Sequence, residues 1–334
     1  MLAARITGYE GCFSYFETKK LIKELDEFCP DVVHLHTLHN SYINLRLLFS
    51  YIKKKNILVV WTLHDCWPFT GHCTHFTVVQ CDKWKTGCDK CTQIREYPSS
   101  IFDNSRKMWK HKKRWFTGVK NMIIVTHSKW LANLVKQSYL KEYSIRIINN
   151  GIDLSVFKPT ENDFKIAKNI GKRKIILGVT SVWNDKKGLS DFVKLSQVLD
   201  DDYQIVLVGV SKTQISELPP NIIAIERTNS KKELAMIYSA ADVFVNPTYE
   251  ETFPTTNLEA RACQLLIVTY RTGGSPESSG EYGVVVECGN IEQLKREIIS
   301  VCKAKNIAVS DCEGLDNQTV YGRYLDIYKM SGAC

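Results

Sequence analysis

The sequence has no run of apolar residues as long as the ~18 that a membrane-spanning helix requires. Its first residues, 1–8, also lack the apolar stretch of a secretory signal peptide. No recognised nucleic-acid-binding module accompanies its basic residues. These absences argue against an integral membrane protein, a secreted protein and a nucleic-acid-binding protein, and we expect a cytoplasmic location.

Positive charge is concentrated in residues 106–116, within a chain of net charge +8. If this segment is helical, its aromatic residues fall on one side and most of its cations on the other. One interpretation is peripheral contact with anionic lipid at the inner face of the cytoplasmic membrane. The other is an ordinary packed helix with aromatic residues in the core and solvated lysines. We favour the second, because most buried helices of a charged protein have this pattern.

The composition is that of a globular protein, 44% hydrophobic and 24% charged, and 334 residues are enough for about two domains. Nearly continuous apolar strands alternate with helices in both halves, which is typical of parallel sheets covered on both faces. We therefore expect an α/β fold of two Rossmann-like, doubly wound domains facing a central cleft. The expected parts are a first domain over 1–150, a linker over 151–172, a second domain over 173–320 and a C-terminal helix over 321–334 that packs back on the first domain.

The expected elements follow this alternation. The expected strands are 31–36, 57–62, 122–126, 145–148, 174–179, 204–209, 222–226 and 242–247. The expected helices are 18–28, 42–55, 104–117, 129–139, 188–199 and 231–240.

The most informative segment is 249–260, which carries Glu251 and Glu259 eight positions apart. It lies between the apolar strand at 242–247 and a helix that we expect to open near Thr256, where three successive residues can cap an N-terminus. A helix N-terminus after a strand binds anions through its free N–H groups and its dipole. Carboxylates on either side can accept hydrogen bonds from sugar hydroxyls, so the segment fits a sugar nucleotide.

This spacing, with the strand before it and the helix after it, resembles the signature of the family-4 retaining glycosyltransferases of the GT-B fold. The turn at 149–153 and the run Phe157-Lys158-Pro159 resemble the interdomain connection of the same family. The resemblance extends from about residue 31 to residue 330. Family members carry a further strand–helix–strand segment before the first helix, so the chain looks N-terminally shortened.

The resemblance assigns roles to residues of both halves. The expected catalytic residues are Glu251, Lys187 and His64, and the expected donor-binding residues are Glu259, Lys186, Phe253, Thr255, Thr256, Asn257 and Arg227. In relatives, Glu259 would hold the ribose and Glu251 the hydroxyls of the donor sugar. Thr252 and Pro254 stand where many relatives have glycine, and a proline removes one backbone N–H donor.

The lysines and the histidine each have a structural alternative. Lys187 follows the strand at 174–179 in a turn where an ammonium group can neutralise a departing diphosphate. Position 182, where the family pattern has arginine, is valine, and Lys186 is expected to supply the second cation. His64 resembles the histidine that faces the donor sugar across the cleft. The alternatives are two solvated lysines at a helix start and a core histidine pinned by hydrogen bonds.

The resemblance implies a hexosyltransferase-type reaction in bacterial capsule, exopolysaccharide or O-antigen synthesis. A sugar would pass from a nucleotide-diphosphate sugar to a saccharide or lipid-linked acceptor with retention of configuration and without a catalytic metal. No protein nucleophile is evident, and the leaving diphosphate would help to deprotonate the acceptor. The competing interpretations are a sugar-nucleotide epimerase of the same fold and a non-catalytic sugar-nucleotide-binding remnant.

A cysteine-rich insertion occupies residues 66–91. Four of its cysteines, in the pattern C-x7-C-x6-C-x2-C, are Cys73, Cys81, Cys88 and Cys91. Four soft ligands with a terminal C-x-x-C suit a structural zinc ion, and a reducing compartment disfavours disulfides. Unligated reduced thiols and disulfides remain alternatives, because one C-x-x-C without a second pair is not specific.

Overall fold

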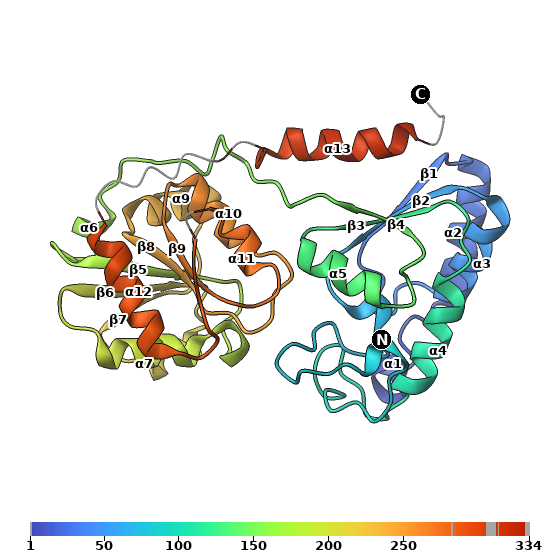
Figure 1. Ribbon diagram of the computed structural model, residues 1–334, viewed down its shortest axis with the longest axis horizontal. Coiled ribbons are helices and arrows are strands. Elements are labelled where there is room, and N and C mark those ends of the chain that lie inside the picture. Colours follow the sequence, from blue (N-terminus) through green and yellow to red (C-terminus); the bar gives the residue numbers. More distant parts are fainter. Residues whose placement is uncertain (1, 282, 305–311, 313, 331–334) are drawn as a thin grey trace. The chain divides into compact units, whose positions relative to one another are not determined.

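The computed structural model describes residues 2–281, 283–304, 312 and 314–330. The chain divides into two compact units, Met1–Asn149 with Gly322–Cys334 and Asn150–Tyr321. Each unit is built around its own parallel β-sheet with helices beside it (Figure 1). The expected α/β fold with two parallel sheets is therefore confirmed.

The first unit contains a sheet of order β1-β2-β3-β4. Its strands are β1 (Val32–Leu35), β2 (Leu58–Leu63), β3 (Met122–Thr126) and β4 (Ser144–Ile147). Its helices are α1 (Leu2–Thr7), α2 (Tyr15–Phe28), α3 (Leu45–Lys55), α4 (Ser105–Phe116) and α5 (Lys129–Gln137), with short 3-10 turns at Trp67–Phe69 and Lys83–Lys85. All residues of β3 are buried, which explains the unbroken apolar run of that strand. The strand order follows the chain order, so the described part of this sheet has no reversal of winding.

The second unit contains a sheet of order β10-β9-β8-β5-β6-β7. Its strands are β5 (Lys174–Val179), β6 (Tyr203–Val208), β7 (Ile222–Ile225), β8 (Val243–Asn246), β9 (Ile267–Tyr270) and β10 (Val284–Val286). Its helices are α6 (Phe164–Ala167), α7 (Leu189–Val198), α8 (Lys212–Glu217), α9 (Lys231–Ala240), α10 (Thr255–Ala262), α11 (Ser275–Ser278) and α12 (Ile291–Lys303), with a 3-10 turn at Asp185–Lys187. The chain winds outward from β5 to β7 and then returns to β8 on the other side of β5. This reversal creates a crevice at the carboxyl ends of β5 and β8, where ligands of such folds bind.

Two segments depart from the simple division expected from the sequence. Residues 151–172 pack into the second unit, where Ile152, Phe157 and Ile170 are buried and Ile152 pairs with Asp316. The C-terminal helix α13 (Asn317–Lys329) begins earlier than the expected 321–334, and residues 331–334 lie outside the described residues. The Tyr328 hydroxyl of α13 lies 2.6 Å from His34 Nδ1 of the first unit.

Helix α4 shows how the basic segment packs. Met108, Trp109 and Phe116 are buried in the first unit, as a core-facing helix requires. Lys112 is also buried, with its ammonium group 3.6 Å from the centre of the Trp67 ring, and burial lowers its pKa to about 7. The aromatic face of α4 is thus used inside the protein. In the part of the chain that the structure describes, no helix is both long and apolar enough to cross a bilayer.

Candidate functional site

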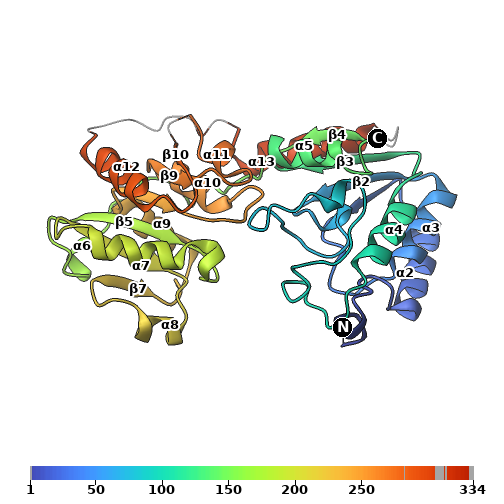
Figure 2. The same cartoon turned by 60° about the horizontal axis from the view of Figure 1, so that its bottom comes forward.

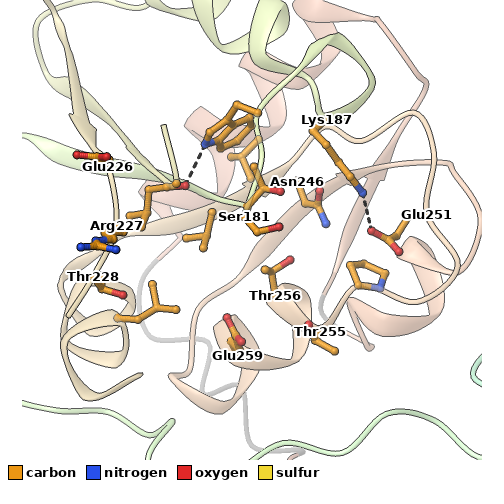
Figure 3. Close-up of a pocket in the computed structure, with 18 of the residues that line it drawn as sticks. Ser181, Lys187, Glu226, Arg227, Thr228, Asn246, Glu251, Thr255, Thr256 and Glu259 are labelled. Atoms are coloured by element: carbon orange, nitrogen blue, oxygen red, sulfur yellow. Dashed lines mark hydrogen bonds and ion pairs between the residues drawn. The ribbon is translucent and has the colours of Figure 1, made fainter. Parts of the chain in front are cut away.

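A cavity of about 620 Å³ lies in the second unit at the reversal of its sheet. The loops after β5, β6, β7 and β8 and the start of α10 form its walls (Figure 3). Seven residues expected from the sequence line it: Lys187, Arg227, Glu251, Phe253, Thr255, Thr256 and Glu259. Four separate stretches of the second unit therefore meet where a sugar nucleotide was expected.

Lys187 and Glu251 form an ion pair in this cavity (Figure 3). The Lys187 ammonium group lies 2.9 Å from Glu251 Oε2 and donates to the Glu250 carbonyl at 3.2 Å. Glu251 Oε1 accepts from the Thr252 amide at 3.0 Å, so both carboxylate oxygens are held. The turn is fixed locally because the Asn184 side chain caps it by accepting from the Lys187 amide at 3.0 Å. The pair thus presents one cation and one carboxylate side by side at the cavity wall.

Lys186 has a different environment, although it is the next residue along the chain. Its ammonium group pairs with Glu250 Oε2 at 3.1 Å, and Lys186 does not line the cavity. The structure therefore brings Lys187 into the candidate site and pairs Lys186 with Glu250, which does not line the cavity either. The use of Lys186 as a second cation for the donor stays a prediction.

Glu259 is a largely buried carboxyl group on α10 that lines the cavity. Tyr238 of α9 donates to Glu259 Oε2 at 2.9 Å and holds that side chain in position. Burial raises the pKa of Glu259 to about 7, against the opposing effect of the Tyr238 hydrogen bond. Near neutral pH the group is thus divided between its neutral and ionised forms. It can both donate to and accept from a vicinal diol such as a ribose.

Helix α10 starts at Thr255, one residue before the expected position, and its cap differs from the expected one. Pro254 occupies the N-cap position, and no side chain caps the helix. Thr255 and Thr256 lie in its first turn beside the cavity (Figure 3), where backbone amides are available to an anion. The expectation that the residues of 255–257 cap this helix is therefore wrong.

Asn257 serves the packing of the second unit. It is fully buried, its Oδ1 accepts from Asn246 at 2.8 Å, and its Nδ2 donates to Ser278 Oγ at 2.8 Å. It does not line the cavity, so the structure does not bring it together with the other donor-binding candidates. Its amide instead joins α10 to the end of β8 and to α11.

One lining residue at the end of β7, Glu226, was missed by sequence reasoning. Glu226 and Thr228 flank Arg227 at the cavity wall (Figure 3), and Arg227 is exposed. A carboxylate as the last residue of the expected strand 222–226 was the available signal. Only the strand order shows that this strand end lies beside that of β6, on the same side of the cavity.

The histidines of the first unit gather at the carboxyl ends of β1, β2 and β3. His64 Nε2 lies 3.0 Å from His36 Nδ1, and His64 Nδ1 lies 3.3 Å from His127 Nε2. Burial, followed by the neighbouring His127 and His36, lowers the pKa of His64 to about 4, so the ring is neutral near pH 7. Sequence reasoning named His64 alone as catalytic and did not foresee this chain of imidazoles. The expected role of His64 toward a donor sugar stays a prediction.

The four cysteines expected to bind zinc line one hollow of about 280 Å³ in the first unit. Cys88 Sγ accepts from the Gly71 amide at 3.1 Å, but burial outweighs this contact and raises the pKa of the Cys88 thiol to about 11. A hydrogen bond from Cys73 lowers the pKa of Cys91 to about 7. Within the described residues, however, no three histidine, cysteine or acidic side chains are already arranged to hold a metal ion. Zinc binding by this cluster stays a prediction.

Comparison with known protein families yields a match in each half of the chain. The model described as Glycosyltransferase Family 4 matches residues 5–156. The model described as Glycosyl transferases group 1 matches residues 160–313, which include the whole cavity lining.

Individual relatives agree with these matches. WcaC of Escherichia coli, described as a colanic acid biosynthesis glycosyl transferase, is 26% identical over 255 residues, covering 74% of this chain and 62% of its own. An N,N'-diacetylbacillosaminyl-diphospho-undecaprenol α-1,3-N-acetylgalactosaminyltransferase of Campylobacter jejuni is 29% identical over 223 residues, covering 59% of this chain and 57% of its own. The chain thus spans less than two thirds of the length of either relative.

Solved structures share the fold. Sucrose-phosphate synthase from Thermosynechococcus elongatus superposes with a TM-score of 0.70 at 17% identity, over 96% of this chain and 79% of that one. Anabaena HepE in complex with UDP superposes with a TM-score of 0.67 at 12% identity, over 94% of this chain and 82% of that one. With a glycosyltransferase family match in each half of the chain, at residues 5–156 and 160–313, the chain belongs to the group 1 and family 4 glycosyltransferases.

Proposed function

We propose that this chain transfers a hexosyl group from a nucleotide-diphosphate sugar to a saccharide or lipid-linked acceptor in the synthesis of a bacterial surface polysaccharide. The observation that carries the proposal is the cavity at the reversal of the second sheet. There the Lys187–Glu251 pair, Glu259 and the open start of α10 converge. Such a set offers groups for the ribose, the diphosphate and the sugar of a sugar nucleotide.

The donor is expected to bind with its ribose at Glu259, its diphosphate at the start of α10 and Lys187, and its sugar at Glu251. An anion placed at α10 gains from the helix dipole and the uncapped amides. The same anion attracts Lys187 and so competes with Glu251 for the ammonium group. Donor binding would therefore loosen the ion pair and free the Glu251 carboxylate to accept from sugar hydroxyls.

The chemistry is expected to retain the configuration of the donor sugar and to need no catalytic metal. Lys187 would stabilise the charge that develops on the departing diphosphate, the largest electrostatic demand of this reaction. The acceptor would attack from the face that the diphosphate leaves, and its proton would pass to a diphosphate oxygen. This proposal is supported by the side chains of the cavity wall, which include the cation Lys187 and the carboxyl groups of Glu251 and Glu259.

The acceptor proposal draws on the names of two relatives. One is described for colanic acid biosynthesis, and the other is named for a diphospho-undecaprenol-linked acceptor. A lipid-linked acceptor would place the enzyme in the cytoplasm at the inner face of the cytoplasmic membrane. A sugar-nucleotide epimerase and a binding remnant are the competing functions.

One assay separates these functions. The chain is incubated with UDP-sugars and GDP-sugars, with and without a polyprenyl-linked glycan fraction, and free UDP or GDP is quantified. The proposal predicts release that depends on the acceptor, with an α-linked product from an α-linked donor by NMR. Interconversion of the donor sugar without release would point to an epimerase, and donor binding without either reaction to a remnant.

A further inference from the structure

A second large hollow lies in the first unit, beside helices α2, α3 and α4. These helices lie next to one another in both views of the ribbon (Figures 1 and 2). The hollow has a volume of about 860 Å³. Its lining includes Tyr15, Arg46, Lys53, His111, Arg114 and Trp115. None of them belongs to the donor cavity, which lies in the other unit.

The basic side chains of this lining lie in two rows, one on α3 and one on α4, and we call the hollow with these rows the cationic trough. Arg46 and Lys53 are seven positions apart on α3, and His111 and Arg114 are three apart on α4, so each pair shares one helix face. The Lys53 ammonium group donates to the Arg114 backbone carbonyl at 3.0 Å, which brings the two rows together.

The positive charge of the trough, carried by Arg46, Lys53 and Arg114, has no carboxylate ion-pair partner among the described residues. Burial and the nearby Arg114 guanidinium lower the pKa of Lys53. Burial and the cations Arg114, Lys107 and Arg46 lower the pKa of His111 as well. Clustered cations without carboxylate partners raise the local potential and attract an anion.

Exposed aromatic side chains accompany the trough. Tyr15 is 45% exposed, and its neighbour Phe16 on α2 is 82% exposed, with the two ring centres 5.6 Å apart. Trp115 is half-buried in the wall of the hollow. Tyrosine and tryptophan are favoured at the depth of lipid headgroups, and a basic surface beside them attracts anionic lipid.

We propose that this trough binds the phosphate headgroup of an anionic membrane lipid. The charge of the trough complements that headgroup, and the exposed rings of α2 can rest at the boundary with the acyl chains. The buried aromatic residues of α4 take no part, because they are used in the core. The proposal needs neither donor binding nor catalysis, so its failure would leave the proposed function untouched.

The test is sedimentation with vesicles of equal parts phosphatidylglycerol and phosphatidylcholine, using the full chain without donor. The Arg46→Gln/Arg114→Gln variant removes two charges from the trough. At about 1 kcal/mol for each cation near an anionic surface, this should weaken binding by about 30-fold. The control Lys136→Gln/Lys141→Gln removes the same charge from exposed residues of the first unit outside the trough, and should change binding by less than about threefold.

Two further measurements sharpen the result. An Arg46→Lys/Arg114→Lys variant keeps the charge and should retain most of the binding, which would show that folding is intact. Equal losses in the trough variant and the control would overturn the site in favour of general charge attraction. Failure of the wild type to sediment with these vesicles would overturn it as well. Stabilisation by inorganic phosphate without vesicle binding would replace the lipid with a free phosphate ion.

Discussion

Lys186 and Lys187 are adjacent in one turn, yet only Lys187 lines the donor cavity. Lys187→Ala should reduce transfer by about 100- to 1000-fold, because it removes the cation that we propose stabilises the departing diphosphate. Lys186→Ala is the matched control and should cost less than about tenfold, since Lys186 pairs with Glu250 outside the cavity lining. The measurement is the rate of nucleoside diphosphate release at saturating donor. Equal losses in both variants would contradict the assignment.

The raised pKa of Glu259 predicts that the free energy of unfolding depends on pH. Burial raises its pKa to about 7 in the folded chain from an ordinary value of 4.5, so the folded state holds this proton more tightly than the unfolded state. The resulting stabilisation is present below pH ~4.5 and is lost as the pH rises toward 7, on the order of 3 kcal/mol in total.

Glu259→Gln removes this titration and keeps the side-chain shape. Between pH 5 and pH 8, the wild type should therefore lose stability relative to the variant as the pH rises. The measurement is urea denaturation of both proteins at several pH values. Parallel curves would show that Glu259 titrates normally in the folded chain.

At the scale of single residues, the sequence allowed us to predict cavity-lining side chains that follow strands. It did not allow us to predict roles that depend on hydrogen-bond partners far away in the sequence. Lys187 and Glu251 lie in the segments that follow β5 and β8, and the structure brings both to one cavity. The family resemblance assigned Asn257 to the donor. Its buried partners Asn246 and Ser278 are joined to it only by the folded chain. The chemistry expected of the lining residues remains to be measured.

At the scale of elements, Gly209 at the end of β6 shows how tightly the cavity wall is built. Its φ is +93°, and a Cβ added there would lie 1.6 Å from the Thr180 carbonyl oxygen. Gly209→Ala should therefore displace the ends of β5 and β6, and it should weaken nucleotide binding as well as stability. The control is Gly171→Ala, which also has a positive φ, +66°, but meets no atom within 4 Å.

The Gly171→Ala control should lower the free energy of unfolding by only about 1 kcal/mol, because an alanine there adopts the left-handed backbone conformation. The Gly209→Ala variant should show a clearly larger decrease in the free energy of unfolding when both variants are measured by chemical denaturation. Equal losses in the two variants would mean that β5 and β6 accommodate the methyl group without strain.

Central strands such as β3 were predictable because their apolar runs are buried on both sheet faces, whereas the edge strand β4 is largely exposed. The structure has β3 at Met122–Thr126 as expected, and Ser128 caps α5 by accepting from the Leu131 amide at 3.1 Å. The start of α10 was less predictable. Three residues that favour caps stand together there, but Pro254 takes the cap position. Local preference was overridden by the packing of α10 against β8 and α11.

At the scale of the whole molecule, the segment between β2 and α4 contains only short 3-10 turns. A loop this long without regular structure is unusual in a compact domain. We predict about one zinc ion per purified chain, held by the four cysteines of the insertion. Elemental analysis measures it, and Cys88→Ser/Cys91→Ser should abolish it. Well under one zinc per wild-type chain would contradict the prediction.

Alternation of strands and helices made the two parallel sheets predictable, because each apolar run must be covered on both faces. The reversal of winding in the second sheet was not readable, since strand order depends on contacts between distant segments. The same limit hid the imidazole chain of the first unit, whose members come from three different strand ends.

The most direct test of the donor site is titration calorimetry of the wild type with UDP and GDP, repeated with Glu259→Ala. The control is Glu217→Ala, an exposed glutamate of the second unit outside the cavity lining. We predict that the wild type and the control bind one nucleotide with equal affinity, and that Glu259→Ala weakens it at least tenfold. Equal affinity for that nucleotide in all three proteins would contradict the account.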